Sequence, residues 1–365
     1  MTVHVKGVLA VSHAEYVRTL RPKLPPEAFR PCPHAYLRIG VHFGIVIAGF
    51  VALRATTAIW WPLIALVIGS SMAALAFLAH DLSHRTIVTH RYLLYSTELV
   101  LWALVFMPAT LWRRLHHAHH VHLTSNGDPD RAFLTSDRGL PAVITAALLF
   151  PNRVFRYNPL CLLHFLLYPI RQFIAALFFS GKPSFVTSRP NYSARDKVRI
   201  LLEILFIVAI QGLIAYLVHG AYVWASIVPN VIVSAVVSWY FFTNHCLRRF
   251  HNGDDVLAAT TSVTVPRVCN ILHSNFSYHT EHHLFPAMNS KYYPLVSTLL
   301  KAHFPDHYHR VPMATAWSAL WRCPILDSPR ADSASTFTLE QQIQIPNIRL
   351  TAGSSAQAGQ QASSP

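Results

Sequence analysis

The sequence predicts an all-α membrane protein, with four transmembrane helices in two hairpins, interfacial helices and a histidine-rich cytoplasmic part. Hydrophobic residues make up 52% of the 365 residues and charged residues only 13%, whereas soluble domains carry about 25% charged residues. Several apolar runs are long enough to cross a bilayer, and the 23 histidines outnumber the 16 acidic residues. The five cysteines are scattered without a C-x-x-C pair, which argues against a disulfide framework or a cysteine-ligated zinc.

Four apolar segments define the predicted membrane core, since a spanning helix needs about 20 mostly apolar residues. Their few polar interruptions include Arg54, near the end of the first segment, and Glu203, near the start of the third. Only short connections separate the first segment from the second and the third from the fourth, which predicts two hairpins. The predicted spans are residues 39–59, 60–79, 200–218 and 221–243.

The distribution of Lys and Arg predicts the orientation of these hairpins. Six of these residues precede Ile39, and nine follow Thr243. Fourteen lie between residues 81 and 199, whereas the first hairpin tip has one, Arg54, and the second has none. Because 29 of the 30 basic residues fall on one side, both termini and the middle segment are predicted to be cytoplasmic, at the inner membrane if the cell is bacterial. The net charge of +14 then needs no nucleic-acid partner.

Two further apolar stretches lie in the predicted cytoplasmic middle part. Residues 93–112 include Glu98, and residues 161–180 include Arg171. If either stretch crossed the bilayer, the spans would no longer pair as two hairpins and the basic residues would no longer fall on one side. Both stretches are therefore predicted to be helices that lie in the membrane interface. The predicted division is a cytoplasmic segment 1–38, a membrane domain 39–325 and a Ser/Ala/Gln-rich, disordered tail 326–365.

Three short histidine-rich motifs, here called boxes, follow the predicted helices. HDLSH at 80–84 has imidazoles at i and i+4, and both HHAHH at 116–120 and HTEHH at 279–283 contain H-x-x-H-H. A shuffled chain would contain H-x-x-H-H only about 0.1 times. On a helix, positions i, i+3 and i+4 share one face, so each H-x-x-H-H box is expected to offer three nitrogens to a metal. Eight such ligands fit two metal ions, and imidazole suits iron, zinc or copper.

The placement of the boxes separates several classes of metal protein. All three lie at predicted cytoplasmic ends of helices, whereas a metal transporter places its ligands within the spans near the midplane. The soluble di-iron oxidases use Glu-x-x-His pairs, and none of the six glutamates has a histidine three residues later. A metal-binding membrane enzyme is therefore favoured, with a non-enzymatic metal transporter as the alternative from another class.

These motifs resemble the three histidine boxes of the integral-membrane fatty acid desaturases. The likeness rests on HDLSH, on HHAHH followed by NGDPD at 126–130, and on NFSYHTEHHLFP at 275–286, and it covers about residues 35–320. It implies two iron ions, O₂ as co-substrate, and removal of hydrogen from unactivated methylenes of an acyl chain. The implied iron ligands are His80, His84, His116, His119, His120, His279, His282 and His283.

The resemblance also suggests a ninth ligand, because family members often carry an extra His or Asn at the end of the last span. His245 occupies that place, next to Asn244, which is a candidate supporting group. Carboxylates often orient metal-bound histidines. The candidates for this role are Asp81, Asp128, Asp130 and Glu281, while His117, His122, His251 and His273 are expected to be supporting or surface residues.

The expected reaction is O₂-dependent desaturation of an acyl chain, with hydroxylase, acetylenase or carotenoid ketolase activity as alternatives on the same scaffold. The acyl group could be carried by a lipid, by CoA or by acyl carrier protein. There is no His-Pro-Gly-Gly haem segment, so electrons must come from a separate carrier of the ferredoxin or cytochrome b5 type. Arg113 and Arg114 are candidates for contact with a substrate or lipid phosphate. The candidates to line a substrate tunnel are Trp60, Trp61, Trp102, Trp112 and Trp239.

Overall fold

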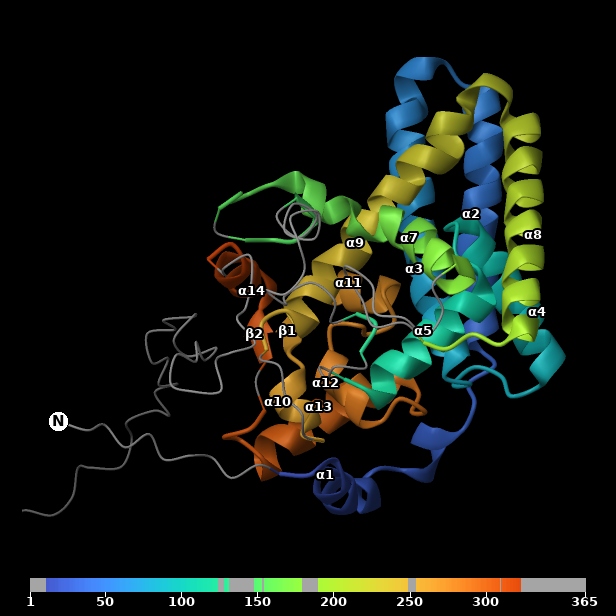
Figure 1. Ribbon diagram of the computed structural model, residues 1–365. Coiled ribbons are helices and arrows are strands. Elements are labelled where there is room, and N and C mark those ends of the chain that lie inside the picture. Colours follow the sequence, from blue (N-terminus) through green and yellow to red (C-terminus); the bar gives the residue numbers. More distant parts are fainter. Residues whose placement is uncertain are drawn as a thin grey trace, which may run out of the picture.

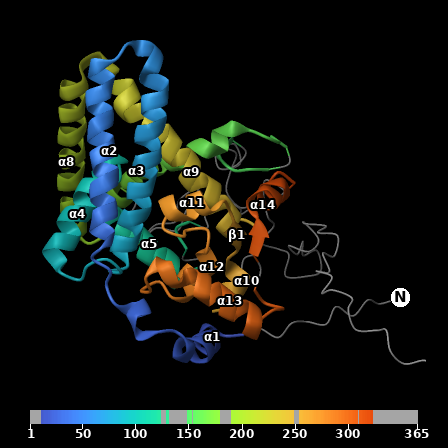
Figure 2. The ribbon, with the colours of Figure 1, turned by 180° about the vertical axis from the view of Figure 1, so that it is seen from behind.

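The computed structural model describes most of the chain, and it is mostly helical. Figure 1 shows a bundle of long helices, with shorter helices and one small sheet gathered at one end of it. The same arrangement is seen from behind in Figure 2. The predicted disordered tail and His251 lie outside the described residues, which are 11–123, 128–130, 148–152, 154–178, 190–248, 254–308 and 310–322.

Each of the four predicted spans coincides with a helix that is long and apolar enough to cross a membrane. The helix of the third span, α8, begins six residues before the predicted start. Ser193 and Asp196 form a capping box at its beginning. A π-helical turn, η6, lies at the start of the fourth. The bounds are α2 Ala35–Ala55, η3 Ala58–Trp60 with α3 Trp61–Ser83, α8 Ala194–Val218 with η5 His219–Ala221, and η6 Val223–Ile227 with α9 Val228–His245.

The inner and outer helices of the bundle differ in burial. Of the most apolar stretch of each helix, 67% is buried in α3 and 56% in α9, but only 17% in α2 and 28% in α8. Exposed apolar side chains on the outer helices, such as Leu37 and Leu205, suit contact with lipid tails. At the centre α3 and α9 approach closely at Gly69, where a Cβ atom would lie 2.8 Å from Cβ of Ile232.

A fifth helical segment, η4 Pro159–Leu163 with α7 His164–Phe178, also meets the criteria of length and apolarity for a span. The sequence predicts an interfacial helix here. Ser234 of α9 ties the start of this segment to the bundle, because its hydroxyl accepts from the Leu166 amide at 2.8 Å and donates to the Leu162 carbonyl at 2.8 Å. Length and apolarity alone do not decide between a spanning and an interfacial helix. The interfacial position of α7 and the hairpin pairing of the other spans remain predictions.

The prediction of one continuous helix over residues 93–112 is wrong, whereas its place in the membrane interface stays a prediction. The structure has two helices instead, α4 Arg91–Leu104 and α5 Ala109–Val121, bent by 97° relative to one another. Two residues account for the break: Phe106 has a φ of 59°, and Pro108 has no amide hydrogen to continue α4. The bend turns α5 away from α4, and α5 carries the second histidine box.

A cap of short elements covers the end of the bundle where the histidine boxes lie (Figure 1). Its sheet pairs β1 with β2 in parallel, with Val263 opposite Val311. Buried apolar residues such as Leu284 and Val296 join the third box to the N-terminal helix in one hydrophobic core. The elements are α1 His13–Leu20, η1 Arg21–Lys23, η2 Pro26–Phe29, α10 Val256–Ala259, β1 Ser262–Thr264, α11 Arg267–Leu272, α12 His279–Leu284, η7 Ser290–Tyr292, α13 Tyr293–His303, β2 Arg310–Pro312 and α14 Met313–Leu320.

Candidate metal centre

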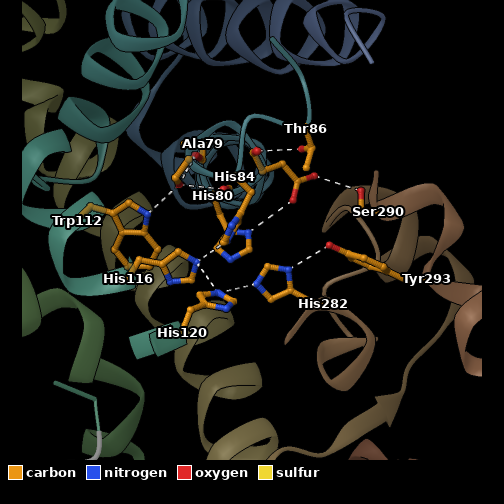
Figure 3. A network of polar contacts seen from close by, with 12 residues as sticks. Ala79, His80, His84, Thr86, Trp112, His116, His120, His282, Ser290 and Tyr293 are labelled. Atoms are coloured by element: carbon orange, nitrogen blue, oxygen red, sulfur yellow. Dashed lines mark hydrogen bonds and ion pairs between the residues drawn. The ribbon is translucent and has the colours of Figure 1, made fainter. Parts of the chain in front are cut away.

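Five histidines from the three boxes converge on one point at the end of the bundle, and we call them cluster one. Nε2 of His116 lies 2.7 Å from Nε2 of His84 and 3.1 Å from Nε2 of His120. Nε2 of His120 lies 3.1 Å from Nε2 of His282, and Figure 3 shows these rings pointing toward one another. Cluster one consists of His80, His84, His116, His120 and His282, whose ligand atoms all lie within 4.8 Å of one another.

Four further histidines form a second group beside the first, which we call cluster two. His119, His245 and His283 bring their ligand atoms within 4.8 Å of one another. His279 joins them, with its Nε2 atom 2.6 Å from Nε2 of His245 and 3.0 Å from Nε2 of His283. The two clusters touch, because the ring centroids of His120 and His283 are 4.3 Å apart.

Each H-x-x-H-H box divides its histidines between the two clusters, which corrects the expectation that all three serve one metal. In the second box, His116 and His120 face cluster one and His119 faces cluster two. In the third box, His282 faces cluster one while His279 lies in cluster two. Helical geometry explains the division: at 3.6 residues per turn, positions i and i+4 are about 40° apart, whereas i+3 and i+4 are about 100° apart.

The donor set in these clusters fits metal ions and not a hydrogen-bond network. A ring nitrogen carries either one hydrogen or one lone pair, so it makes one hydrogen bond along its axis. Nε2 of His116 and Nε2 of His120 each face two other Nε2 atoms at 2.7 to 3.1 Å. Nε2 of His80 is buried and has no hydrogen-bond partner within the described part of the chain. Lone pairs directed at a common point are what a metal ion requires.

Burial keeps three of the cluster imidazoles neutral, whereas the pKa of His119, which burial alone would lower, is raised to about 9 by Asp128 and Asp130. Removal from water, reinforced by the neighbouring histidines, lowers the pKa of His84, His282 and His283 well below the ordinary value of 6.5. Neutral imidazole is the form that binds a metal. The nitrogens of these three rings are therefore ready to act as ligands at neutral pH.

Hydrogen bonds at Nδ1 turn Nε2 of several rings toward the clusters. Nδ1 of His119 lies 2.9 Å from Oδ1 of Asp128, so this nitrogen donates to the carboxylate and Nε2 is the nitrogen left to bind a metal. Nδ1 of His80 lies 3.5 Å from Oδ1 of Asp81 but makes no hydrogen bond among the described residues, so the orienting role of this acid stays a prediction. Nδ1 of His282 lies 3.0 Å from the hydroxyl of Tyr293. No motif identifies Tyr293, which lies on a separate helix.

Other predicted supporting residues lie elsewhere. Glu281 orients none of the described histidines: its carboxylate accepts hydrogen bonds from Ser262, at 2.5 Å, and from Tyr308. It thereby fastens α12 to the cap, so the expected role was wrong. His273 makes a hydrogen bond of 3.0 Å with Tyr240 and lies in neither cluster.

Asn244 and the two other expected histidines that are described also differ in their surroundings. Asn244 is fully buried, next to His245, and both of its amide atoms have no hydrogen-bond partner among the described residues. This position suits the supporting role expected for it. His117 and His122 are exposed, in agreement with a surface position.

Carboxylates hold α5 in place and with it the second box. Both the amide and the hydroxyl of Thr110, at the start of α5, donate to Glu203 of α8, at 2.8 and 2.6 Å. One turn further along, Arg113 pairs with Glu98 at 2.8 Å. Arg114 donates to both carboxylate oxygens of Asp196 at 3.0 and 2.8 Å.

A narrow apolar cavity runs from cluster one into the bundle. It has a volume of about 70 Å³, and it is lined by His80, Trp102, Trp112 and residues of α7 and α9. Two of the five tryptophans proposed from the sequence thus line it. Trp60 is instead 57% exposed, and neither Trp61 nor Trp239 is among the lining residues.

A second, wider cavity of about 530 Å³ also borders cluster one, where it is lined by His84, His116 and His120. Its wall is strongly basic. The charged lining residues are Arg85, Arg113, Arg114, Arg199 and Asp196. A cavity with this charge favours an anionic ligand or partner.

Comparison with known proteins places this chain in a family. None of the curated proteins compared matches the chain. The model of the fatty acid desaturase family matches residues 56–315, a range that contains all three histidine boxes and both clusters. The chain therefore belongs to the fatty acid desaturase family, which implies an oxidoreductase.

Proposed function

We propose that the protein is an O₂-dependent di-iron desaturase that introduces a double bond into a fatty acyl chain by removing hydrogen from two adjacent methylenes. The observation that carries this proposal is the gathering of nine buried or half-buried imidazoles in two touching clusters. Nitrogen ligands of this kind suit iron. Two neighbouring sites match the two iron ions expected for the family.

The protein's own residues would hold the irons and keep the site dry. Cluster one would bind one ion through His80, His84, His116, His120 and His282, and cluster two would bind the other through His119, His245, His279 and His283. The iron pair, once bound, would supply the oxidising power toward O₂ and C–H bonds that side chains alone lack. Asp128 and Tyr293 would fix the tautomer and direction of their histidine ligands.

The apolar cavity would position the substrate. It opens at His80 and is walled by Trp112, whose ring stacks on His116 at an angle of 13°. An acyl chain in this cavity would lie against cluster one without water beside it. Such alignment is the main contribution that a protein scaffold makes to this class of reaction.

The basic cavity would receive an anionic group on the cytoplasmic side. Four arginines line it, and a phosphate on a lipid, on CoA or on acyl carrier protein carries the complementary charge. An acidic ferredoxin or a cytochrome b5 could approach the same cationic face to deliver electrons. We also propose that both termini and the clusters are cytoplasmic, because 29 of the 30 Lys and Arg residues fall on that side of the spans.

Lipid analysis after expression in a host that lacks the product tests the function. We expect gas chromatography to find a new unsaturated acyl chain with the wild type, and none with His282→Ala or without O₂. The control His303→Ala changes an exposed histidine outside both clusters and should leave the product unchanged. An oxygenated chain instead of an alkene would indicate a hydroxylase or ketolase.

Metal analysis distinguishes the enzyme from a transporter. An enzyme retains close to two irons per chain after purification, and its expression changes the lipids. Cells that accumulate metal while their lipids stay unchanged would favour transport and would contradict the proposed function.

A further inference from the structure

One helix connects the apolar cavity with the second histidine cluster. Phe165, Leu166 and Pro169 of α7 form part of the cavity wall. Between them lies Tyr168, which is 2% exposed. Tyr168 is not among the lining residues, and its hydroxyl donates to Oδ1 of Asp130 at 2.6 Å.

Asp130 in turn belongs to the group that orients His119. Oδ2 of Asp130 lies 3.7 Å from Nδ1 of His119, and Oδ1 of Asp128 lies 2.9 Å from the same nitrogen. The two acids are also joined to each other, because the Asp130 amide donates to Asp128 at 2.9 Å. A displacement of Tyr168 would therefore move both carboxylates that face Nδ1 of His119.

The size of the cavity makes such a displacement necessary. Its volume of about 70 Å³ is far below the ~300–1,000 Å³ typical of ligand pockets. An acyl chain that enters it has to push the lining outward, and α7 supplies three of the lining residues. Packed interiors transmit such strain because they contain few voids.

From these contacts we propose that Tyr168 is a positioning residue for cluster two: through Asp130 it holds His119, and it transmits the displacement of α7 by an acyl chain to this cluster. The inference rests on the proposed di-iron function and deepens it, because it couples occupancy of the cavity to the geometry of the second iron site. Within the described part of the chain, Tyr168 has no such connection to cluster one.

The test uses full-length protein in nanodiscs of short-chain saturated lipid, loaded with ⁵⁷Fe(II) and examined by Mössbauer spectroscopy. Tyr168→Phe keeps the ring and removes only the hydroxyl. We expect this variant to bind the iron in cluster two about tenfold more weakly, as happens when metal-bound histidines lose an outer hydrogen bond. Only the Mössbauer signal of that iron should change. Stearate added to the ferrous wild type should shift the same signal, and this shift should be absent in Tyr168→Phe.

A matched control removes a hydroxyl from another buried tyrosine–aspartate pair. The hydroxyl of Tyr16 donates to Oδ1 of Asp255 at 3.1 Å, and neither residue belongs to a histidine cluster. Tyr16→Phe should keep both iron signals and the response to stearate. The iron in cluster one serves as an internal check that Tyr168→Phe is folded.

The outcomes separate this inference from the function. Identical iron affinity and spectra in wild type and Tyr168→Phe would overturn the positioning role, and a wild type without response to stearate would overturn the transmission. A wild type that responds as expected but makes no unsaturated lipid would leave the inference standing and contradict desaturation. A wild type that binds no iron would overturn both.

Discussion

Glu203 offers a test of how the membrane helices hold the metal centre, although it lies in α8 and contacts no histidine of the clusters. Its carboxylate accepts from the Thr110 amide at 2.8 Å, the Thr110 hydroxyl at 2.6 Å and the Tyr95 hydroxyl at 2.7 Å. The Thr110 amide is one of the unpaired donors at the start of a helix. Glu203 thus caps α5 from a neighbouring helix, since Pro108 provides no side-chain cap.

Replacing Glu203 by alanine should destabilise the protein strongly. Both donors of Thr110 are buried, and a buried donor without a partner costs about 1–3 kcal/mol. Together with the partly buried hydroxyl of Tyr95, the expected loss in unfolding free energy is about 3–5 kcal/mol. Glu203→Gln keeps one acceptor but sets an amide NH₂ against one donor, so its expected loss is about 1–3 kcal/mol.

Denaturant unfolding in mixed micelles, combined with iron analysis, measures both consequences. Because α5 supplies histidines to both clusters, Glu203→Ala should lower the iron content of both. Glu27 is exposed on η2, and Glu27→Ala should change stability by less than about 0.5 kcal/mol. A Glu203→Ala protein with the stability and iron content of the wild type would refute the capping role.

Three further predictions concern packing, pH and substrate. Gly69→Ala should lower the free energy of unfolding by about 1–3 kcal/mol, because the new Cβ would lie 2.8 Å from Ile232. Gly212→Ala, whose Cβ would have nothing within 4 Å, should raise it by about 0.4–1 kcal/mol. Thermal unfolding measures both changes. Burial lowers the pKa of His273 from 6.5 to about 4. Below pH 6.5 the unfolded chain therefore binds a proton at His273 that the folded chain does not bind. This one site should lower stability by up to about 1.4 kcal/mol per pH unit as pH drops from 6.5 toward 4. In unfolding titrations, His273→Phe should reduce the acid slope by this amount, while the other buried histidines keep their share. Val233→Trp, in the cavity wall, should shift the lipid products toward shorter chains.

Each of these predictions can fail clearly. Equal effects of alanine at Gly69 and Gly212 would show that the close approach of α3 and α9 does not constrain the bundle. An unchanged acid slope in His273→Phe would mean that His273 is protonated in the folded protein. Unaltered chain lengths with Val233→Trp would place the substrate outside the apolar cavity.

Much of the helical core could be predicted from the sequence because hydropathy is a local property of each segment. All four predicted spans coincide with candidate membrane helices. The break between α4 and α5 was missed, since the apolar run continues through it, although Pro108 was a visible signal. Whether α7 crosses the membrane depends on its packing partners, which a local pattern does not contain.

The histidines of the site could be predicted for a similar reason, because the spacing within each box is local. Their division between two clusters follows from the helical angle between neighbouring positions, once all three boxes are placed together. Their supports could not be predicted: Tyr293, Tyr168 and Glu203 are distant in the chain from the groups they contact. Glu281 shows the opposite error, since a carboxylate inside a box contacts Ser262 and Tyr308 and no histidine ring.

In the proposed enzyme the two histidine clusters hold two iron ions side by side. X-ray absorption at the iron edge, together with metal counting on purified protein, can detect this iron pair and its ligands. We expect two irons per chain with nitrogen ligands and no sulfur, and a lowered count in both His84→Ala and His245→Ala, one variant for each cluster. Less than one iron per chain, sulfur ligation, or a count unaffected by either variant would contradict it.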